Sequence, residues 1–363
     1  MTKRILLVGI TKGGTGPTSG IMTKVMDQIE GNCEIYFCGY DPNTPSLDDK
    51  YNLCLSDPRR GISTPALRYR IRRKIHHLLQ WDDCTLGSQT IFTHLQKYAH
   101  LNFDLVIGIA GIFSFVEAAY QFARQNHLPL KLAYFDPFTN NSLAKNIKKR
   151  EKLEQRWLSY AEKLYYNLEN LVPAHLQKCN KLVGFHIPMF PQPLTTWTQD
   201  NALIYGGSFY KGIREPELLY RFANSVKNSR FSIECYSNLK YYPKDSNIHF
   251  APMLNRKQFE QKCLSARGLI YIGNSDKNLK SSKYLEYIIW HKPIIGVNVE
   301  QDNEVRKYKY YVNENDPKLI EKLKSITQAE LLAYDPLLDF PNRDPKVLAE
   351  ELFRVEPIKK DVN

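Results

Sequence analysis

The segment from Gly268 to Gly296 concentrates side chains that could bind an anionic ligand. An apolar run ends there in a polar loop, and a helical pattern that Ser281 or Ser282 would cap follows. A repeat of 3.6 residues per turn predicts one face in the core and an opposite face outside it. The core face would carry Leu285, Ile288 and Ile289, and the opposite face Lys283, Glu286, Tyr287 and Trp290.

The opposite face has the chemistry to hold a diphosphate and a ribose. A helix N-terminus offers amide groups and a partial positive charge to phosphate, and Lys283 adds a full charge close by. Glu286 lies about one turn further on and could accept hydrogen bonds from two ribose hydroxyls. The same spacing also suits a Lys–Glu pair on a solvated helix face, so these residues alone leave both interpretations open.

A glycine-rich loop follows the first apolar run of the chain. Its residues Lys12 to Gly16 resemble the phosphate loop of ParA-like ATPases, but Pro17 stands where those enzymes have a phosphate-binding lysine. Proline offers neither charge nor an N–H group, which argues against an ATPase. The loop is either a tight turn before a helix that begins at Pro17 or a flexible loop that presents amides to a substrate. Its candidate residues are Gly13, Gly14, Thr15 and Gly16.

Two carboxylates in the first half of the chain are candidates for acid–base chemistry. Asp136 follows a predicted strand and could act as the base of an inverting reaction, although it could equally cap the turn before Pro137. Glu117 lies at the start of an apolar helix and is the weaker candidate. No Asp-x-Asp sequence occurs, and the seven cysteines form no Cys-x-x-Cys pair. We therefore expect no metal site and mostly buried, reduced thiols.

The elements that position these residues alternate between apolar strands and amphipathic helices, a pattern typical of parallel sheets with helices on both faces. The predicted strands are Arg4–Ile10, Glu34–Tyr40, Asp104–Gly111, Lys131–Asp136, Ala202–Gly206, Phe231–Ser237, Gly268–Gly273 and Pro293–Asn298, and the predicted helices include Glu215–Lys227 and Ser282–His291. Three prolines between Ile187 and Pro193 indicate a linker. The sequence thus predicts two Rossmann-like domains, residues 1–190 and 191–344, with the tail from about 345 to 363 packing back on the first, and ligands bound in a cleft between them.

Length, composition and charge limit the function classes. The 363 residues, 43% hydrophobic, suffice for two domains that each bury a core. No apolar run is long enough to span a membrane, and the N-terminus does not resemble a signal peptide, so we expect a cytoplasmic protein. The net charge of +12 indicates an anionic partner, which could be nucleic acid, an acidic membrane surface or a phosphorylated small molecule.

The segment from Ile272 to Ile295 resembles the donor-binding stretch of GT-B glycosyltransferases, especially those similar to glycosyltransferase family 4 that make bacterial surface polysaccharides. The resemblance rests on four short motifs in the family's order: Ile272-Gly273-Asn274, Ser282-Lys283, Glu286-Tyr287 and Lys292-Pro293-Ile294-Ile295. It implies that the helix binds the diphosphate and that Glu286 binds the ribose. The chain departs from the family at Ser281, where proline is usual, and at Trp290 and His291, where a small residue and glycine are usual. The first of the family's paired glutamates is missing near Asn278 or Leu279.

A second match covers Ile204 to Glu217, which resembles the opening of the family's C-terminal domain. There a glycine-rich turn, here Gly207 and Ser208, precedes a basic residue that touches the donor phosphates. Lys211 and Arg214 are the candidates for that role, and Asn274 completes the expected donor site. A solvated loop is the alternative interpretation of the two basic residues. The resemblance covers the second half of the chain; the first half matches only in topology.

The resemblance implies a metal-independent transfer of sugar from a nucleotide-sugar donor, expected to be a UDP-sugar, to a glycan or lipid-linked acceptor, with no further cofactor. A GT-B-type sugar-nucleotide epimerase or hydrolase is the nearest enzymatic alternative. A basic nucleic-acid-binding protein is the alternative from another class, since the run from Arg68 to Lys74 could bind phosphates, but no nucleic-acid motif accompanies it. We therefore expect no nucleic-acid partner.

The basic segments of the first half could also hold the enzyme peripherally at the inner face of an anionic membrane. They are Arg59-Arg60, Arg68 to Lys74, and Lys145 to Arg150. A solvated surface that promotes solubility explains the same charges equally well.

Overall fold

The computed structural model describes residues 2–11, 17–29, 33–41, 51–56, 87–139, 146–168, 171–190, 200–239, 247–275, 281–299 and 304–354. The chain divides into two compact units. Unit 1 comprises Met1–Pro188 and Pro345–Asn363, and unit 2 comprises Met189–Asp344. The division falls within the proline-rich segment, two residues before the boundary expected from the sequence.

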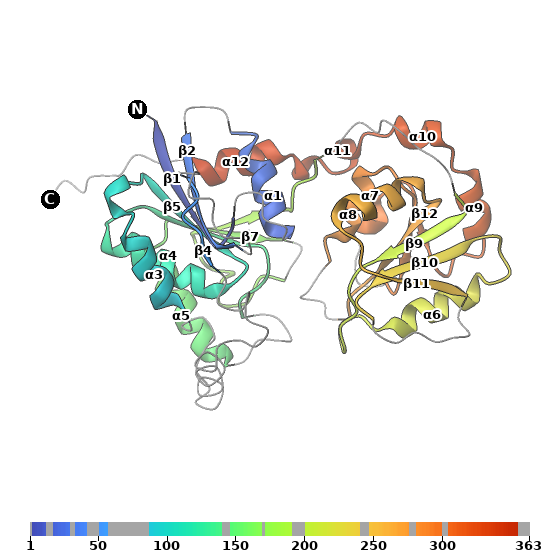
Figure 1. Ribbon diagram of the computed structural model, residues 1–363, viewed down its shortest axis with the longest axis horizontal. Helices are drawn as coiled ribbons and strands as arrows, with labels where there is room; N and C mark the ends of the chain where they lie inside the picture. The colour runs from blue at the N-terminus through green and yellow to red at the C-terminus, as the bar shows by residue number, and fades with distance from the viewer. Residues whose placement is uncertain are drawn as a thin grey trace. The chain divides into compact units, whose positions relative to one another are not determined.

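Unit 1 is built on a six-stranded parallel sheet in the order β2-β1-β5-β6-β7-β8 (Figure 1). Its strands are β1 (Lys3–Val8), β2 (Cys33–Cys38), β5 (Leu105–Ala110), β6 (Leu130–Tyr134), β7 (Lys163–Asn167) and β8 (Leu182–Phe185). The short strands β3 (Tyr40–Asp41) and β4 (Leu55–Ser56) form a separate pair. Strand β5 is buried along its whole length, which explains its uninterrupted apolar sequence.

The helices of unit 1 follow its strands, as the alternating pattern predicts. They are α1 (Pro17–Met26), α3 (Ser88–Gln96), η1 (Ala99–Leu101), α4 (Phe113–Gln125), α5 (Ile147–Tyr160) and α12 (Pro345–Phe353). Helix α4 is the most deeply buried of them, and its Phe115 and Phe122 belong to the core beside the sheet.

The C-terminal helix α12 packs in unit 1, beside α1 (Figure 1). A buried lysine on β6 holds its end: Lys131 Nζ donates to the carbonyl oxygens of Glu351 at 2.9 Å, Leu352 at 3.2 Å and Arg354 at 2.7 Å. The Tyr165 hydroxyl also donates to the Glu351 carbonyl, at 2.7 Å. These bonds satisfy carbonyl groups that the last turn of a helix leaves without partners.

Unit 2 has a second six-stranded parallel sheet in the order β11-β10-β9-β12-β13-β14. Its strands are β9 (Ala202–Gly206), β10 (Ser232–Ser237), β11 (Ile248–Pro252), β12 (Gly268–Ile272), β13 (Ile294–Val297) and β14 (Tyr311–Asn313). Counted within the unit, this is the 3-2-1-4-5-6 order of the Rossmann fold. The direction of winding reverses between β9 and β12, and ligands of such sheets bind beyond the carboxyl ends of the strands at that point.

The helices of unit 2 are shorter than those of unit 1 on average. They are α6 (Pro216–Ser225), α7 (Arg256–Ser265), α8 (Lys283–Ile289), η2 (Val305–Lys307), α9 (Leu319–Ser325), α10 (Gln328–Leu332), α11 (Pro336–Asp339) and η3 (Pro341–Arg343). Helix α7 begins with a capping box, in which Asn255 Oδ1 accepts from the Gln258 amide at 3.0 Å and Gln258 bonds back to Asn255. In the described part of the chain, no helix is both long and apolar enough to cross a membrane.

Candidate functional site

The loops that follow β9 and β12 meet at the reversal point of the unit 2 sheet. The β9 loop is compact, because Tyr210 and Arg214 exchange backbone hydrogen bonds of 3.0 and 2.9 Å. Gly212 turns the chain between them with a φ of 76°, a conformation that favours glycine. Lys211 is exposed on this turn, so its ammonium group is available to an anion.

Arg214 and Asn274 connect the two loops. The guanidinium donates to Asn274 Oδ1 through Nη2 at 2.7 Å and through Nε at 3.1 Å. A backbone bond reinforces this link, since the Ser275 amide donates to the Ile213 carbonyl at 2.8 Å. Two residues that the sequence assigned to the donor site therefore lie in direct contact, although they are separated by 60 positions.

The Gly206–Gly207 backbone passes close to this link. A side chain added at Gly207 would lie 3.1 Å from the Tyr205 hydroxyl and 3.4 Å from Arg214 Nη1. The next residue, Ser208, is half-buried, and its Oγ lies 3.8 Å from the sulfur of Met253. The Gly207 amide donates to the Tyr236 carbonyl at 3.1 Å, so the glycine-rich turn is held against β10 beside a fixed guanidinium.

Helix α8 carries the second pair of interacting polar side chains, after Arg214 and Asn274. Lys283 Nζ lies 2.6 Å from Glu286 Oε2, and both side chains are 28% exposed. Ser282 occupies the N-cap position without a side-chain capping bond, whereas Ser281 Oγ accepts weakly from the Lys283 amide at 3.4 Å. The Tyr271 hydroxyl donates to the Ser281 carbonyl at 3.0 Å and so fixes the entry to the helix.

The prediction that one face of α8 lies outside the core is wrong for two aromatic residues, one in the helix and one at its end. Tyr287 and Trp290, expected on the non-core face, are 1% and 4% exposed. The helix has only seven residues and lies among β12, β13 and the Phe259 ring of α7, so five of the seven are buried. Only Lys283 and Glu286 of the predicted face retain access to solvent.

Charges of both polar pairs act on the buried Tyr287. Burial raises the pKa of this tyrosine well above its ordinary value; Glu286 raises it further, and Arg214 opposes the rise. Geometry links the two pairs: a side chain at Gly207 would lie 3.4 Å from Arg214 Nη1, and the neighbouring Gly206 touches the Phe259 ring, whose centroid is 4.7 Å from Lys283 Nζ. Arg214, Asn274, Lys283 and Glu286 are together called the donor-side cluster here.

The departures from the family pattern at the end of α8 have local explanations. His291 adopts a φ of 51°, the left-handed conformation for which glycine is usual, and its Nδ1 lies 2.8 Å from the Leu331 carbonyl.

Lys292 is fully buried, with Nζ donating to the Ala266 carbonyl at 3.0 Å. Desolvation lowers the pKa of Lys292 to about 7.

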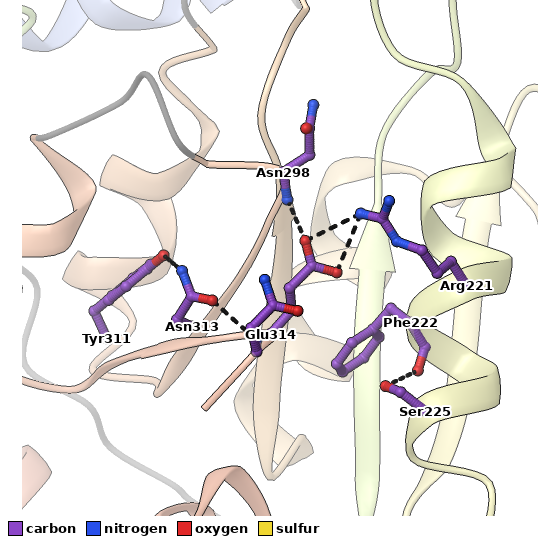
Figure 2. A network of polar contacts seen from close by, with 8 residues as sticks. Arg221, Phe222, Ser225, Asn298, Tyr311, Asn313 and Glu314 are labelled. Carbon is purple, nitrogen blue, oxygen red and sulfur yellow. Dashed lines mark hydrogen bonds and ion pairs between the residues drawn. The ribbon is translucent and has the colours of Figure 1, made fainter. Parts of the chain in front are cut away.

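Sequence reasoning missed a carboxylate at the end of β14. Figure 2 shows Glu314 accepting from the Asn298 amide at 2.8 Å and from Arg221 Nη2 at 3.3 Å. Asn298 follows β13 with a φ of 54°, and its carbonyl crowds Gly273 at the end of β12. Glu314 thus fixes a strained turn beside the donor-side cluster. No sequence motif includes Glu314, and the one feature that could have revealed it is the position of an acidic residue directly after a short edge strand.

In unit 1, Asp136 and Glu117 lie in different surroundings. Asp136 follows β6 and keeps an exposed surface, yet protein atoms crowd its carboxyl group, and this desolvation raises its pKa. Glu117 is buried within α4, where its carboxylate accepts from Trp157 Nε1 at 2.5 Å, from Gln121 Nε2 at 2.7 Å and from Arg156. The geometry gives Glu117 a structural role, because three donors already occupy its oxygens.

Other predicted features lie outside the described residues. These are the loop residues Gly13, Gly14, Thr15 and Gly16, the pair Arg59-Arg60, and the basic run from Arg68 to Lys74. Of the third basic segment, Lys148 and Lys149 are described and exposed. Across the described ranges, no group of three or more His, Cys, Asp or Glu side chains could hold a metal ion.

Comparison with known proteins places the fold. No protein-family model matches the sequence, and no curated protein does. Among solved structures, the calicheamicin glycosyltransferase CalG4 is similar with a TM-score of 0.53 at 12% identity, over 98% of this chain and 100% of that one. HepE of Anabaena, solved in complex with UDP and glucose, is similar with a TM-score of 0.52 at 8% identity, over 98% of this chain and 96% of that one.

These similarities define the fold class. The protein has the two-domain α/β GT-B fold, with one six-stranded parallel sheet in each unit, as the sequence predicts. At such low identities the likeness establishes the fold alone, because one fold hosts many activities. The activity must be argued from the site.

Proposed function

We propose that this protein is a metal-independent glycosyltransferase, which binds a nucleotide-sugar donor in unit 2 and a glycan or lipid-linked acceptor in unit 1. One observation carries the proposal: the donor-side cluster lies at the strand-order reversal of unit 2, where Rossmann-type sheets bind nucleotides. The GT-B fold, and the UDP bound to one similar structure, support the same conclusion.

The donor-side cluster and the neighbouring β9 loop supply groups for the ribose and the diphosphate of a nucleoside diphosphate. Glu286 is placed to accept hydrogen bonds from the ribose hydroxyls. Arg214, fixed by Asn274, and Lys283 provide two positive charges for the diphosphate, and the exposed Lys211 provides a third. The amide of Ser208 adds a backbone donor, whereas the Gly207 amide already donates to the Tyr236 carbonyl at 3.1 Å. The expected donor is a UDP-sugar, as in the similar structure that holds UDP.

Three cations can replace a metal during transfer. The bond between the anomeric carbon and the diphosphate oxygen breaks, a new bond to the acceptor oxygen forms, and the acceptor hydroxyl releases its proton. Negative charge grows on the departing diphosphate, and preorganised cations stabilise that charge without reorganising. We therefore expect activity in the presence of EDTA and no cofactor other than the donor.

Asp136 is our candidate base for the acceptor proton. Its crowded carboxyl group has a raised pKa, which makes its ionised form a stronger base than an ordinary aspartate. It follows the carboxyl end of β6, the edge at which ligands of unit 1 would bind. A base in this position implies inversion at the anomeric carbon.

The four motifs from Ile272 to Ile295 favour a relationship to glycosyltransferase family 4 and a role in surface-polysaccharide synthesis. Features of unit 1 favour an acceptor carried on a membrane. Three aliphatic side chains after β6 and β7 are roughly half exposed: Ile147 at 48%, Leu168 at 45% and Leu171 at 54%. The exposed Lys148 and Lys149 accompany Ile147. Exposed apolar groups beside cations suit the surface of an anionic leaflet.

Nucleotide binding tests the donor site. Glu286→Ala should weaken binding of UDP by about 1.5–3 kcal/mol, the range for hydrogen bonds to a charged group, measured by titration calorimetry. Glu260→Ala is a matched control, because this half-buried glutamate on α7 of unit 2 lies outside the donor-side cluster and should leave UDP binding unchanged. If a folded Glu286→Ala protein bound UDP with the affinity of the wild type, the assignment of Glu286 to the ribose would be refuted.

Vesicle co-sedimentation tests the membrane partner. Binding should require anionic lipid, be lost in about 0.5 M salt as the Debye length shortens, and weaken when Lys148 and Lys149 become glutamine. The same substitutions at Arg70, Arg72 and Arg73 test the basic run of the first half. Equal binding to neutral and anionic vesicles would point to a soluble acceptor.

A further inference from the structure

Phe259 and Trp290 surround the ammonium group of a lysine in the donor-side cluster. Building on the proposed function, we propose that these two rings are positioning residues that hold Lys283 ready for the donor diphosphate. Neither ring was assigned a functional role from the sequence. Trp290 stands where the family that the sequence resembles usually has a small residue.

The geometry is that of a cation held by aromatic faces. Lys283 Nζ lies 4.7 Å from the centroid of the Phe259 ring and 6.0 Å from that of Trp290. Both rings are buried, at 7% and 4% exposure. The face of an aromatic ring carries negative charge density and attracts a cation within about 6 Å, more strongly where water is excluded.

The Phe259 ring has little room to move. It lies directly on Gly206, where even one added methyl group would overlap the ring. Tyr236 and Trp290 pack against it edge-on, with centroids 6.2 and 6.0 Å away. The capping box at Asn255 fixes the start of α7, the helix that carries the ring. The ring is therefore a rigid support at the carboxyl end of β9.

Glu286 completes the surroundings of Lys283 with its 2.6 Å ion pair. The lysine side chain nonetheless remains 28% exposed, so its ammonium group can donate to an incoming anion. A lysine on a solvated surface must lose its rotamer freedom when it binds phosphate, whereas here the surroundings have already ordered it. Preorganisation of this kind improves affinity by lowering the ordering cost of binding.

Calorimetry with paired ligands separates positioning from packing. The probes are UDP, GDP and dTDP with their matched nucleosides uridine, guanosine and thymidine. Phe259→Leu should weaken binding of the preferred diphosphate about three- to tenfold, the range for a cation–π contact, and leave the nucleoside unchanged. In a Lys283→Met background, Phe259→Leu should have no further effect, because the lysine it positions is gone.

Two replacements guard against misfolding. Trp290→Phe keeps an aromatic face beside the ammonium group in a smaller side chain and should bind the diphosphate nearly as wild type does. Phe259→pentafluorophenylalanine reverses the charge of the ring face at nearly constant shape and should weaken diphosphate binding as the leucine does. Equal weakening of diphosphate and nucleoside, or the same loss with Lys283 absent, would overturn the positioning role. Failure of the wild-type protein to bind any of the six probes would instead refute the proposed function.

Discussion

Replacing the buried Lys292 tests whether its surroundings disfavour a charge. The pKa of Lys292 falls from 10.5 to about 7 because burial desolvates the ammonium group. Below pH 7 both folded and unfolded states bind the proton, and the folded state bears the full cost of a buried charge. Between pH 7 and 10.5 the unfolded state binds more protons, so stability must rise with pH.

The magnitude follows from the two pKa values. A difference of this size corresponds to about 5 kcal/mol at low pH, of which about 2 kcal/mol is relieved between pH 7 and pH 9. Lys292→Met removes the titrating group and also its 3.0 Å bond to the Ala266 carbonyl. We therefore expect the variant's stability, relative to wild type, to decline by about 2 kcal/mol over the same pH interval.

Urea denaturation at pH 6, 7, 8 and 9, followed by tryptophan fluorescence, measures this difference; the signal comes from four tryptophans, of which the buried Trp290 lies in unit 2 and the buried Trp157 in unit 1. Lys324→Met is the matched control, because Lys324 is exposed and its removal should shift stability equally at every pH. A wild-type-minus-variant difference that stays constant from pH 7 to pH 9 would refute the reasoning, since the folded state would then hold an ordinary lysine.

Two further substitutions, each with a matched control, test the backbone near the proposed donor site. Glu314→Ala should cost about 1–3 kcal/mol of unfolding free energy, because it leaves the Asn298 amide without its 2.8 Å acceptor. Arg221→Ala removes the 64% exposed partner of the same carboxylate and should cost under about 1 kcal/mol. Equal losses in the two variants would contradict the view that the bond from the Asn298 amide dominates. Gly206→Ala should cost about 1–3 kcal/mol, since the added methyl overlaps the Phe259 ring. Gly20→Ala on α1, where no atom lies within 4 Å, should be neutral or stabilising by up to about 1 kcal/mol, and thermal unfolding compares the two.

Much of the fold could be predicted because its central strands are buried on both faces and therefore apolar throughout. Strands β5, β9 and β12 fall within one or two residues of their predicted bounds. Sequence reasoning missed the short pair of β3 and β4, and within the two six-stranded sheets it missed four strands, β7, β8, β11 and β14. Three of these lie at sheet edges, where shorter and more polar sequences suffice, and β11 ends at Pro252. Strand β7 lies inside the sheet, but its sequence is Lys-Leu-Tyr-Tyr-Asn. The polar atoms of these side chains make a buried strand resemble a solvated segment.

The candidate site was predictable where short-range spacing carries the information. Lys283 and Glu286 lie three residues apart on one helix, so helical geometry alone pairs them. The aromatic support at Phe259 and the turn held by Glu314 depend on which strands are neighbours, and no local pattern encodes that. The burial of Tyr287 was mispredicted for a related reason: a helix shorter than two full turns between a sheet and another helix has no fully solvated face.

The bonds from Lys131 to the end of α12 also determine the order in which the protein can be completed. The lysine and the Glu351 carbonyl are 220 residues apart in sequence. At a synthesis rate of about 5–20 residues per second, the nascent chain exposes β6 roughly 10 to 45 s before its acceptors leave the ribosome. During that interval unit 2 can fold as a continuous segment, whereas unit 1 still lacks the helix that receives its buried ammonium group. The unit whose strands emerge first is therefore the last to mature.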